Sequence, residues 1–461
     1  MWFFNKISIT YQLDKDIMKR SFLMLPALLL SLVSSAALAD DARPFISTLS
    51  PISLPNVSPA NSDLANRGAY VARTADCMAC HREDYSGGVA IETPIGNIYS
   101  TNISPSRRYG IGNYTEADLK KALQKGRSPE HQIYPAMPYP SYHGMSDDDI
   151  SALFAYLQTV PPIEKPPEKT TKLPFPLNIR TLMLAWNVIN VPSTKNRAGL
   201  TPVQQRGEYL VNNTEHCGTC HTPRNLTQGL DKDRYLSGAP LGKWYAPNIT
   251  PDNDTGIGRW SEADIVTYLR TGKLDKRAYA GGPMAEAVAH STRYLTDADL
   301  SAMAAYLKVV PMIKTDDYLI PLDKSRLPTP VSRSITYDLI EQEKYISQAK
   351  ANVTSGPLNS PKLLYLTHCA SCHGVDGYAQ PDARYASIVG LSSIRRAKPD
   401  ALVNVIGFGA KGALNTAPKM PGFEKDLTHA QIASITNYVR VNFGGLAAST
   451  VTENDVKRIM K

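Results

Sequence analysis

All six cysteines of the chain belong to Cys-x-x-Cys-His motifs. Two thiols at this spacing can add to the vinyl groups of a porphyrin, and the adjacent histidine can then ligate the iron. Three copies in 461 residues are too many to be accidental. The sequence therefore predicts three covalently bound haem c groups. Their attachment cysteines are Cys77 and Cys80, Cys217 and Cys220, and Cys369 and Cys372, and their axial iron ligands are His81, His221 and His373.

Two other uses of paired cysteines fit the spacing less well. A structural zinc site would place its two cysteine pairs about 15–20 residues apart, whereas these pairs begin at positions 77, 217 and 369. A thioredoxin-like redox pair would be single and would lie beside a βαβ pattern. With every cysteine assigned to haem attachment, none remains for a structural disulfide.

A six-coordinate haem iron needs a second axial ligand, and methionine in that position raises the reduction potential. One methionine in a Gly- or Pro-rich stretch, which we expect to be a loop, lies 47 to 63 residues after each motif histidine: Met137, Met284 and Met420. We predict that these three are the distal ligands. The alternatives are Met145, His131 and His143 for the first haem and His290 for the second, whereas Met303 has the surroundings of a core residue.

Internal repeats place each motif in a module of its own. The segment RGAYV at 67–71 is repeated as RGEYL at 206–210, TNISP at 101–105 as PNITP at 247–251, and GIGNYTEAD at 110–118 as GIGRWSEAD at 256–264. A shorter third unit carries the last motif. The predicted modules are the first (62–165), the second (200–315) and the third (358–446), and Pro-rich linkers separate them.

The modules have the pattern of small, mainly α-helical domains. Thr115, Ser146, Ser261 and Thr296 each precede a carboxylate by three residues, which is typical of a helix N-cap. The apolar spacing that follows is helical, and the Gly- and Pro-rich loops between the helices show little of the alternation of strands. We therefore predict three tandem class I cytochrome c-like domains, with haem filling cores that would otherwise be thin.

Composition and the N-terminus limit the class of protein. The chain is 43% hydrophobic and 20% charged, and its net charge of +8 is spread without long basic runs, which argues against nucleic-acid binding.

The N-terminus has the form of an export signal, with a basic start at 18–20 (MKR), an apolar run from position 22 and the small residues ALA at 37–39. We predict a signal peptide at 1–39, with Met18 as a possible true start, and a periplasmic protein; the alternative is an uncleaved anchor.

Together these motifs resemble a known family, the triheme cytochrome c subunits of bacterial membrane-bound flavoprotein and quinoprotein dehydrogenases. The resemblance covers about 62–446 and includes the segments AMPYPSY at 136–142 and FPLNIR at 175–180. It implies that the methionines matching Met137, Met284 and Met420 are distal ligands. It also implies a flavin or quinone dehydrogenase large subunit as partner, allows a small third subunit, and predicts electron transfer towards ubiquinone at the outer face of the cytoplasmic membrane.

The chain departs from some members of that family at its C-terminus, because only a short polar segment follows residue 445. Membrane attachment could instead come through the partner or through the segment at 182–186, which we expect to pack between modules.

The chain has no nucleotide-binding glycine fingerprint and no nucleophile triad, so substrate oxidation belongs to another polypeptide. Gluconate, a polyol or an alcohol is the expected substrate; a free electron shuttle to an oxidase and a haem peroxidase are the alternatives.

Overall fold

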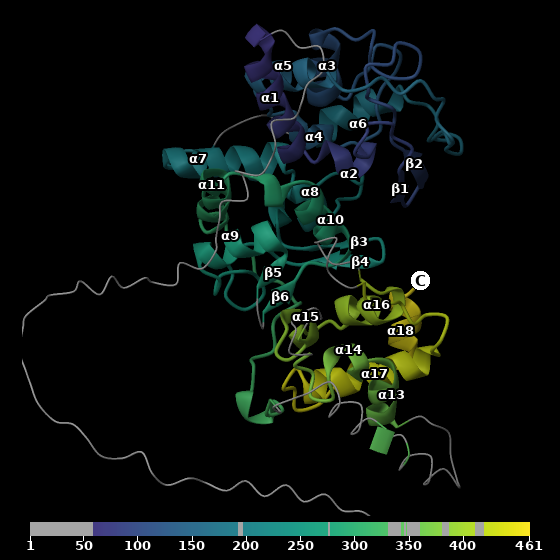
Figure 1. The fold of residues 1–461 in the computed structure, drawn as a ribbon, viewed down its shortest axis with the longest axis vertical. Coiled ribbons are helices and arrows are strands. Elements are labelled where there is room, and N and C mark those ends of the chain that lie inside the picture. Colours follow the sequence, from purple (N-terminus) through teal and green to yellow (C-terminus); the bar gives the residue numbers. More distant parts are fainter. Residues whose placement is uncertain are drawn as a thin grey trace, which may run out of the picture. The chain divides into compact units, whose positions relative to one another are not determined.

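The computed structural model describes residues 59–461 except 192–196, 275–276, 331–342, 345–346, 348–359, 380–386 and 411–418. The predicted signal peptide therefore lies outside the described residues. The fold is mainly helical, as predicted (Figure 1). The elements of the first module are α1 (Pro59–Thr74), α2 (Cys77–His81), β1 (Ala90–Thr93), β2 (Gly96–Tyr99), α3 (Glu116–Lys125), α4 (Tyr139–Tyr142) and α5 (Asp147–Leu157).

The second module repeats this order with more short elements. They are α7 (Pro202–Tyr209), the π-helix η2 (Leu210–Thr214), α8 (Gly218–His221), η3 (Lys232–Arg234), β3 (Ala239–Leu241), β4 (Trp244–Ala246), α9 (Glu262–Thr271), β5 (Lys273–Leu274), β6 (Ala278–Tyr279), α10 (Gly282–His290), η4 (Thr292–Tyr294) and α11 (Asp297–Leu307). The strands form three separate antiparallel hairpins, β1–β2, β3–β4 and β5–β6. These hairpins differ from our expectation of loops, because strands of two to four residues are too short to show alternation.

The linkers and the third module supply the remaining elements. They are α6 (Leu182–Asn190), η5 (Lys324–Arg326), α13 (Pro361–His368), α14 (Ala370–His373), α15 (Ser392–Arg395), α16 (Asp400–Phe408), α17 (His429–Asn442) and α18 (Glu453–Ile459). Helix α18 lies in the short C-terminal segment, packs against α16 and α17, and buries Val456. The polar tail is thus part of the fold of the third module.

The predicted helix starts are confirmed, with one difference. Thr115 and Ser261 form complete capping boxes, in which the carboxylate three residues on accepts a hydrogen bond from the cap's backbone N–H. Ser146 and Thr296 also accept a hydrogen bond from the backbone N–H three residues on. Their partner carboxylates are engaged elsewhere, as described below.

In the first two modules the N-terminal helix crosses the closing helix at a glycine. Helix α1 packs along α5, which lies beside it in Figure 1, and α7 packs along α11 in the same way. A Cβ atom on Gly68 would lie 1.9 Å from the Ala152 carbonyl oxygen, and one on Gly207 would lie 1.9 Å from the Ala302 carbonyl oxygen. The glycine of the repeated RGxY segment is therefore required by close helix packing.

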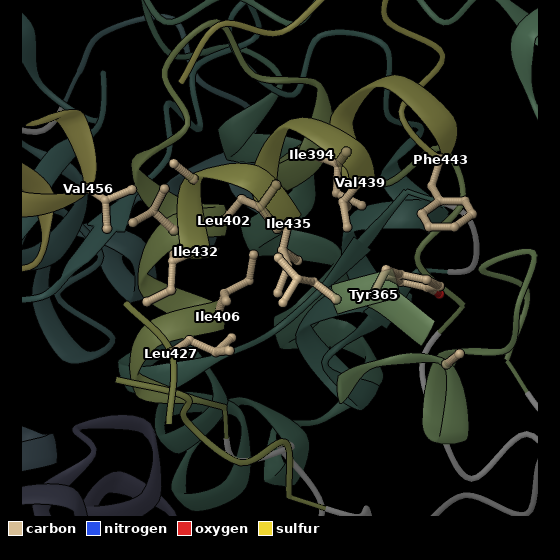
Figure 2. Packing of buried hydrophobic residues seen from close by; sticks show 14 of the residues in the cluster. Tyr365, Ile394, Leu402, Ile406, Leu427, Ile432, Ile435, Val439, Phe443 and Val456 are labelled. Carbon is tan, nitrogen blue, oxygen red and sulfur yellow. The ribbon is translucent and has the colours of Figure 1, made fainter. Parts of the chain in front are cut away.

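The third module has an apolar core of its own around α13, α16 and α17 (Figure 2). Its labelled members are Tyr365, Ile394, Leu402, Ile406, Leu427, Ile432, Ile435, Val439, Phe443 and Val456. A buried ion pair joins the preceding linker to this module, with Arg396 Nη1 3.1 Å from Asp317 Oδ2. The side chains are only 9% and 2% exposed, so the linker is anchored by a desolvated charge pair.

The segment between the first two modules is hydrogen-bonded to both of them. Trp186 Nε1 donates to the Thr227 carbonyl oxygen of the second module, and Asn187 Oδ1 accepts from Tyr139 of the first. The expected packing between modules is therefore confirmed for these polar contacts. The segment nevertheless leaves large apolar side chains exposed, with Phe175 79% and Val188 86% accessible, together with Leu182, Leu184 and Ile189.

Across the described part of the chain, none of the helices combines the length and the apolar character that crossing a bilayer requires.

Candidate haem-binding sites

Each Cys-x-x-Cys-His motif coincides with a short helical turn. The three turns are α2, α8 with the preceding Cys217, and α14 with the preceding Cys369, and each ends at the motif histidine. One turn of helix brings side chains three and four residues apart to the same side. The two thiols and the histidine of each motif are thus held together locally, as haem attachment requires.

The first two motif histidines are oriented by the same contact. His81 Nδ1 lies 2.7 Å from the Thr101 carbonyl oxygen, and His221 Nδ1 lies 2.7 Å from the Pro247 carbonyl oxygen. A carbonyl only accepts, so Nδ1 carries the proton in both rings and Nε2 keeps its lone pair. Thr101 and Pro247 open the repeated TNISP and PNITP segments, which explains why these segments recur.

Desolvation by the surrounding protein shifts the pKa of both kinds of side chain. It lowers the pKa of His81 and of His221, so the rings are neutral, the form that ligates a metal. Burial also raises the pKa of the Cys77 thiol to about 12 and that of Cys369 to about 12. Thiols with such pKa values remain protonated at neutral pH, unlike the thiolates of reactive or zinc-binding cysteines.

The six thiols form no disulfide and are all partly exposed. In the first module, Cys77 and Met137 both pack against one buried apolar cluster. In the second module, Cys217 and Met284 share a cluster in the same way. An apolar cluster in contact with both a free thiol and a thioether fits haem c, so the residues present in these two modules suit the group.

The predicted distal methionines are placed by three different local structures. Met137 lies in the turn before α4, as expected, and its carbonyl accepts from the Tyr139 backbone N–H at 2.7 Å. Met420 is held by a two-way backbone bridge with Ala410, at 3.0 and 2.9 Å. Gly409 allows this bridge, because at φ +75° a Cβ would lie 2.4 Å from the Met420 carbonyl oxygen.

Met284 differs from the expected loop position, because it lies in the first turn of α10. The Gly-Gly-Pro sequence before it begins a helix: Pro283 lacks an N–H and has a preset φ, which suits a first turn. Gly282, at φ +52°, would bring a Cβ within 2.3 Å of the Trp244 ring. The thioether is therefore fixed by a helix start packed against an indole.

The alternative ligands have other contacts. Met145 is 2% exposed and is a member of the first module's apolar core. His143 Nδ1 lies 2.7 Å from the Gln124 carbonyl oxygen, and His131 Nδ1 lies 3.1 Å from Ser128 Oγ. His290 Nδ1 lies 2.9 Å from Glu83 Oε1 in the first module. Met303, predicted to be a core residue, is fully buried. The axial assignment of Met137, Met284 and Met420 stays a prediction.

Comparison with known proteins agrees with this fold. The family described as "Cytochrome c" matches residues 65–161 and 204–311, and the one described as "Cytochrome C oxidase, cbb3-type, subunit III" matches 356–439. The chain is therefore built of cytochrome c domains, and covalently bound haem c is their cofactor.

Full-length relatives narrow the class further. The chain is 39% identical to the fructose dehydrogenase cytochrome subunit of Gluconobacter japonicus, over 88% of this chain and 84% of that protein. It is 38% identical to the cytochrome c subunit of the quinone alcohol dehydrogenase of Gluconacetobacter polyoxogenes, over 90% and 87%. It is 35% identical to the gluconate 2-dehydrogenase cytochrome c subunit of Pantoea cypripedii, over 94% of each. The chain belongs to this family of dehydrogenase cytochrome subunits.

Proposed function

We propose that this chain carries three haem c groups and passes electrons from the catalytic subunit of a dehydrogenase towards ubiquinone. The observation that carries the proposal is the occurrence of three Cys-x-x-Cys-His turns, two of them with the histidine held in the same tautomer by equivalent carbonyls. Bound haem supplies the one-electron chemistry. The cysteines would attach it, the motif histidine would ligate its iron, and a methionine would offer a thioether as a second ligand.

The protein environment favours electron transfer over catalysis at iron. A peroxidase needs an open coordination position, whereas each module offers a methionine in addition to its motif histidine. A thioether ligand raises the potential, which suits an acceptor of electrons from a flavin or quinone. We propose that the substrate of the complex is gluconate, a polyol or an alcohol, oxidised on the partner subunit, which the family relationship supports.

A reconstitution experiment tests this function. The purified chain should accept electrons from artificial reductants but should oxidise no sugar, sugar acid or alcohol alone. Co-purification should bring down a large flavin- or quinone-containing subunit, and the complex should then reduce the haems with substrate. Substrate oxidation by the chain alone would favour the haem enzyme, and isolation without any dehydrogenase would favour the free shuttle.

We further propose a periplasmic location at the outer face of the cytoplasmic membrane, after removal of residues 1–39. The exposed apolar segment around α6 supports attachment to that surface, since Phe175, Leu184 and Val188 are at least half accessible. N-terminal sequencing of the mature protein should begin at Asp40. Replacing Leu184 and Val188 with Ser should reduce binding to vesicles, and unchanged binding would assign attachment to the partner.

A further inference from the structure

The repeated RGxY segment contains two polar residues that haem attachment does not use. Each arginine binds an aspartate in the first turn of its own module's closing helix. Arg67 Nη2 lies 2.7 Å from Asp149 Oδ1, and Arg206 binds Asp299 through Nε and Nη2 at 2.8 and 2.9 Å. These aspartates stand three residues after the caps Ser146 and Thr296, which explains why those capping boxes are incomplete.

Each tyrosine of the segment crosses to the other module and binds the same aspartate there. Tyr70 OH donates to Asp299 Oδ2 at 2.6 Å, and Tyr209 OH donates to Asp149 Oδ2 at 2.6 Å. Each hydroxyl also accepts a backbone N–H at 3.2 Å, from the cap residue of the module it reaches. We call this pair of reciprocal Arg–Asp–Tyr sets the clasp; its members are Arg67, Tyr70, Asp149, Arg206, Tyr209 and Asp299.

The tyrosines and Asp299 of the clasp have the protonation states that its hydrogen bonds need at neutral pH. Burial of Asp299 would by itself raise its pKa, but hydrogen bonds from Arg206 and Tyr70 hold that pKa below its ordinary value. Burial and the bond to Asp149 raise the pKa of Tyr209 to about 12, and burial raises that of Tyr70 as well. The hydroxyls therefore remain donors and the Asp299 carboxylate remains ionised at neutral pH, a combination that gives strong hydrogen bonds.

The modules that the clasp joins also meet at their haem sites. Ser141, four residues after Met137, has its Oγ 3.5 Å from Oγ1 of Thr219, which lies between the cysteines of the second motif. In return, α10, which carries Met284, packs against α2, the first motif. The ligand-bearing segment of each module thus contacts the attachment motif of the other. Such reciprocal contact brings the first and second haem sites next to each other.

We propose that the clasp positions the first and second haem sites against each other, so that these modules form a fixed two-haem relay. This inference rests on the proposed electron-transfer function. In each transfer one electron leaves a ferrous iron, which becomes ferric, and reaches a ferric iron, which becomes ferrous; no bond or proton is exchanged. Tyr70 and Tyr209 are positioning residues in this relay, because their hydroxyls bind Asp299 and Asp149 and not a residue of a haem motif.

The test removes only the two crossing hydroxyls, in the holoprotein. Tyr70→Phe and Tyr209→Phe should each raise the population of separated modules about tenfold, because a lost hydrogen bond to a charged group has roughly that effect. Pulsed EPR between the oxidised haems should show a broadened first-to-second distance in the double variant. Electron exchange between these haems after flash reduction should slow in the double variant, while all three midpoint potentials stay unchanged.

A matched control is Tyr378→Phe, which removes a tyrosine hydrogen bond from the third module to the Pro328 carbonyl of the preceding linker. It should leave the first-to-second haem distance and exchange rate as in the parent. An unchanged distance distribution and rate in the double variant would overturn the clasp proposal while leaving the proposed function intact. Fewer than three haems in the parent protein would instead overturn the proposed function. If the double variant does not load its haems, the same distance and exchange-rate measurements are made on the two single variants. We expect the two single variants to show equal changes.

Discussion

Replacing Asp317 with Ala should destabilise the third module far more than replacing its neighbour Asp316 with Ala. Asp317 forms the buried pair with Arg396, and its carboxylate also accepts the Lys398 backbone N–H at 3.1 Å. Asp317→Ala leaves the Arg396 guanidinium buried without its counter-charge, which costs about 3–5 kcal/mol. Asp316 pairs with Lys398 at 2.8 Å, but its side chain is 80% exposed, so Asp316→Ala should cost at most about 1 kcal/mol.

Hydrogen exchange followed by mass spectrometry suits this comparison, because the chain has several domains and global unfolding need not be two-state. In the Asp317→Ala protein, amides of α16 and α17 should exchange faster by roughly two to nearly four orders of magnitude, since 1.4 kcal/mol is tenfold. Amides of α1 and α5 serve as the internal reference. Equal exchange in the two variants would refute the reasoning, because it would mean that burial of the pair has no energetic effect.

Three further changes have defined outcomes. Met420→His should lower the midpoint potential of the third haem, because imidazole stabilises ferric iron more than thioether does; an unchanged potential in redox titration would remove Met420 as ligand. Gly207→Ala should destabilise the second module by at least about 1–3 kcal/mol in chemical denaturation, since its Cβ would meet a carbonyl oxygen at 1.9 Å; full stability would contradict that packing. The pKa of Asp299 is depressed by Arg206 and Tyr70 against the effect of burial, so its stabilisation is present above about pH 4 and is lost as the pH falls through the lower folded value. The stability difference between the parent and Asp299→Asn should therefore shrink below pH 4, and a pH-independent difference would count against the ionised clasp.

Local patterns in the sequence predicted the local structure well. The haem motifs, the helix caps and the buried position of Met303 all depend on residues within one or two turns of each other, where spacing decides geometry. Met284 was expected in a loop because Gly-Gly-Pro is typical of turns. In the structure the same three residues begin a helix, because Pro283 suits a first turn and Gly282 leaves room for the Trp244 ring.

The clasp could not be predicted, although its residues were visible in the repeat. The repeat places Tyr70 and Tyr209 at equivalent positions, but no local pattern says that each side chain reaches an aspartate at least sixty residues away in another module. The pairing is decided by how the two modules pack, which is a long-range property. A signal was available in retrospect: a polar residue repeated at equivalent positions, beside a glycine needed for close helix packing, is a candidate for an interface.

The central claim is that three haems carry electrons through this one chain. Its most direct test is substrate-driven reduction of the complex purified with its dehydrogenase subunit, with the haems counted by intact mass and followed by visible spectroscopy. The account predicts three covalent haems per chain, low-spin spectra with the weak absorption of methionine–iron coordination, and reduction of all three on addition of substrate. Fewer than three haems, a high-spin ferric spectrum, or haems that stay oxidised while substrate is consumed would contradict it.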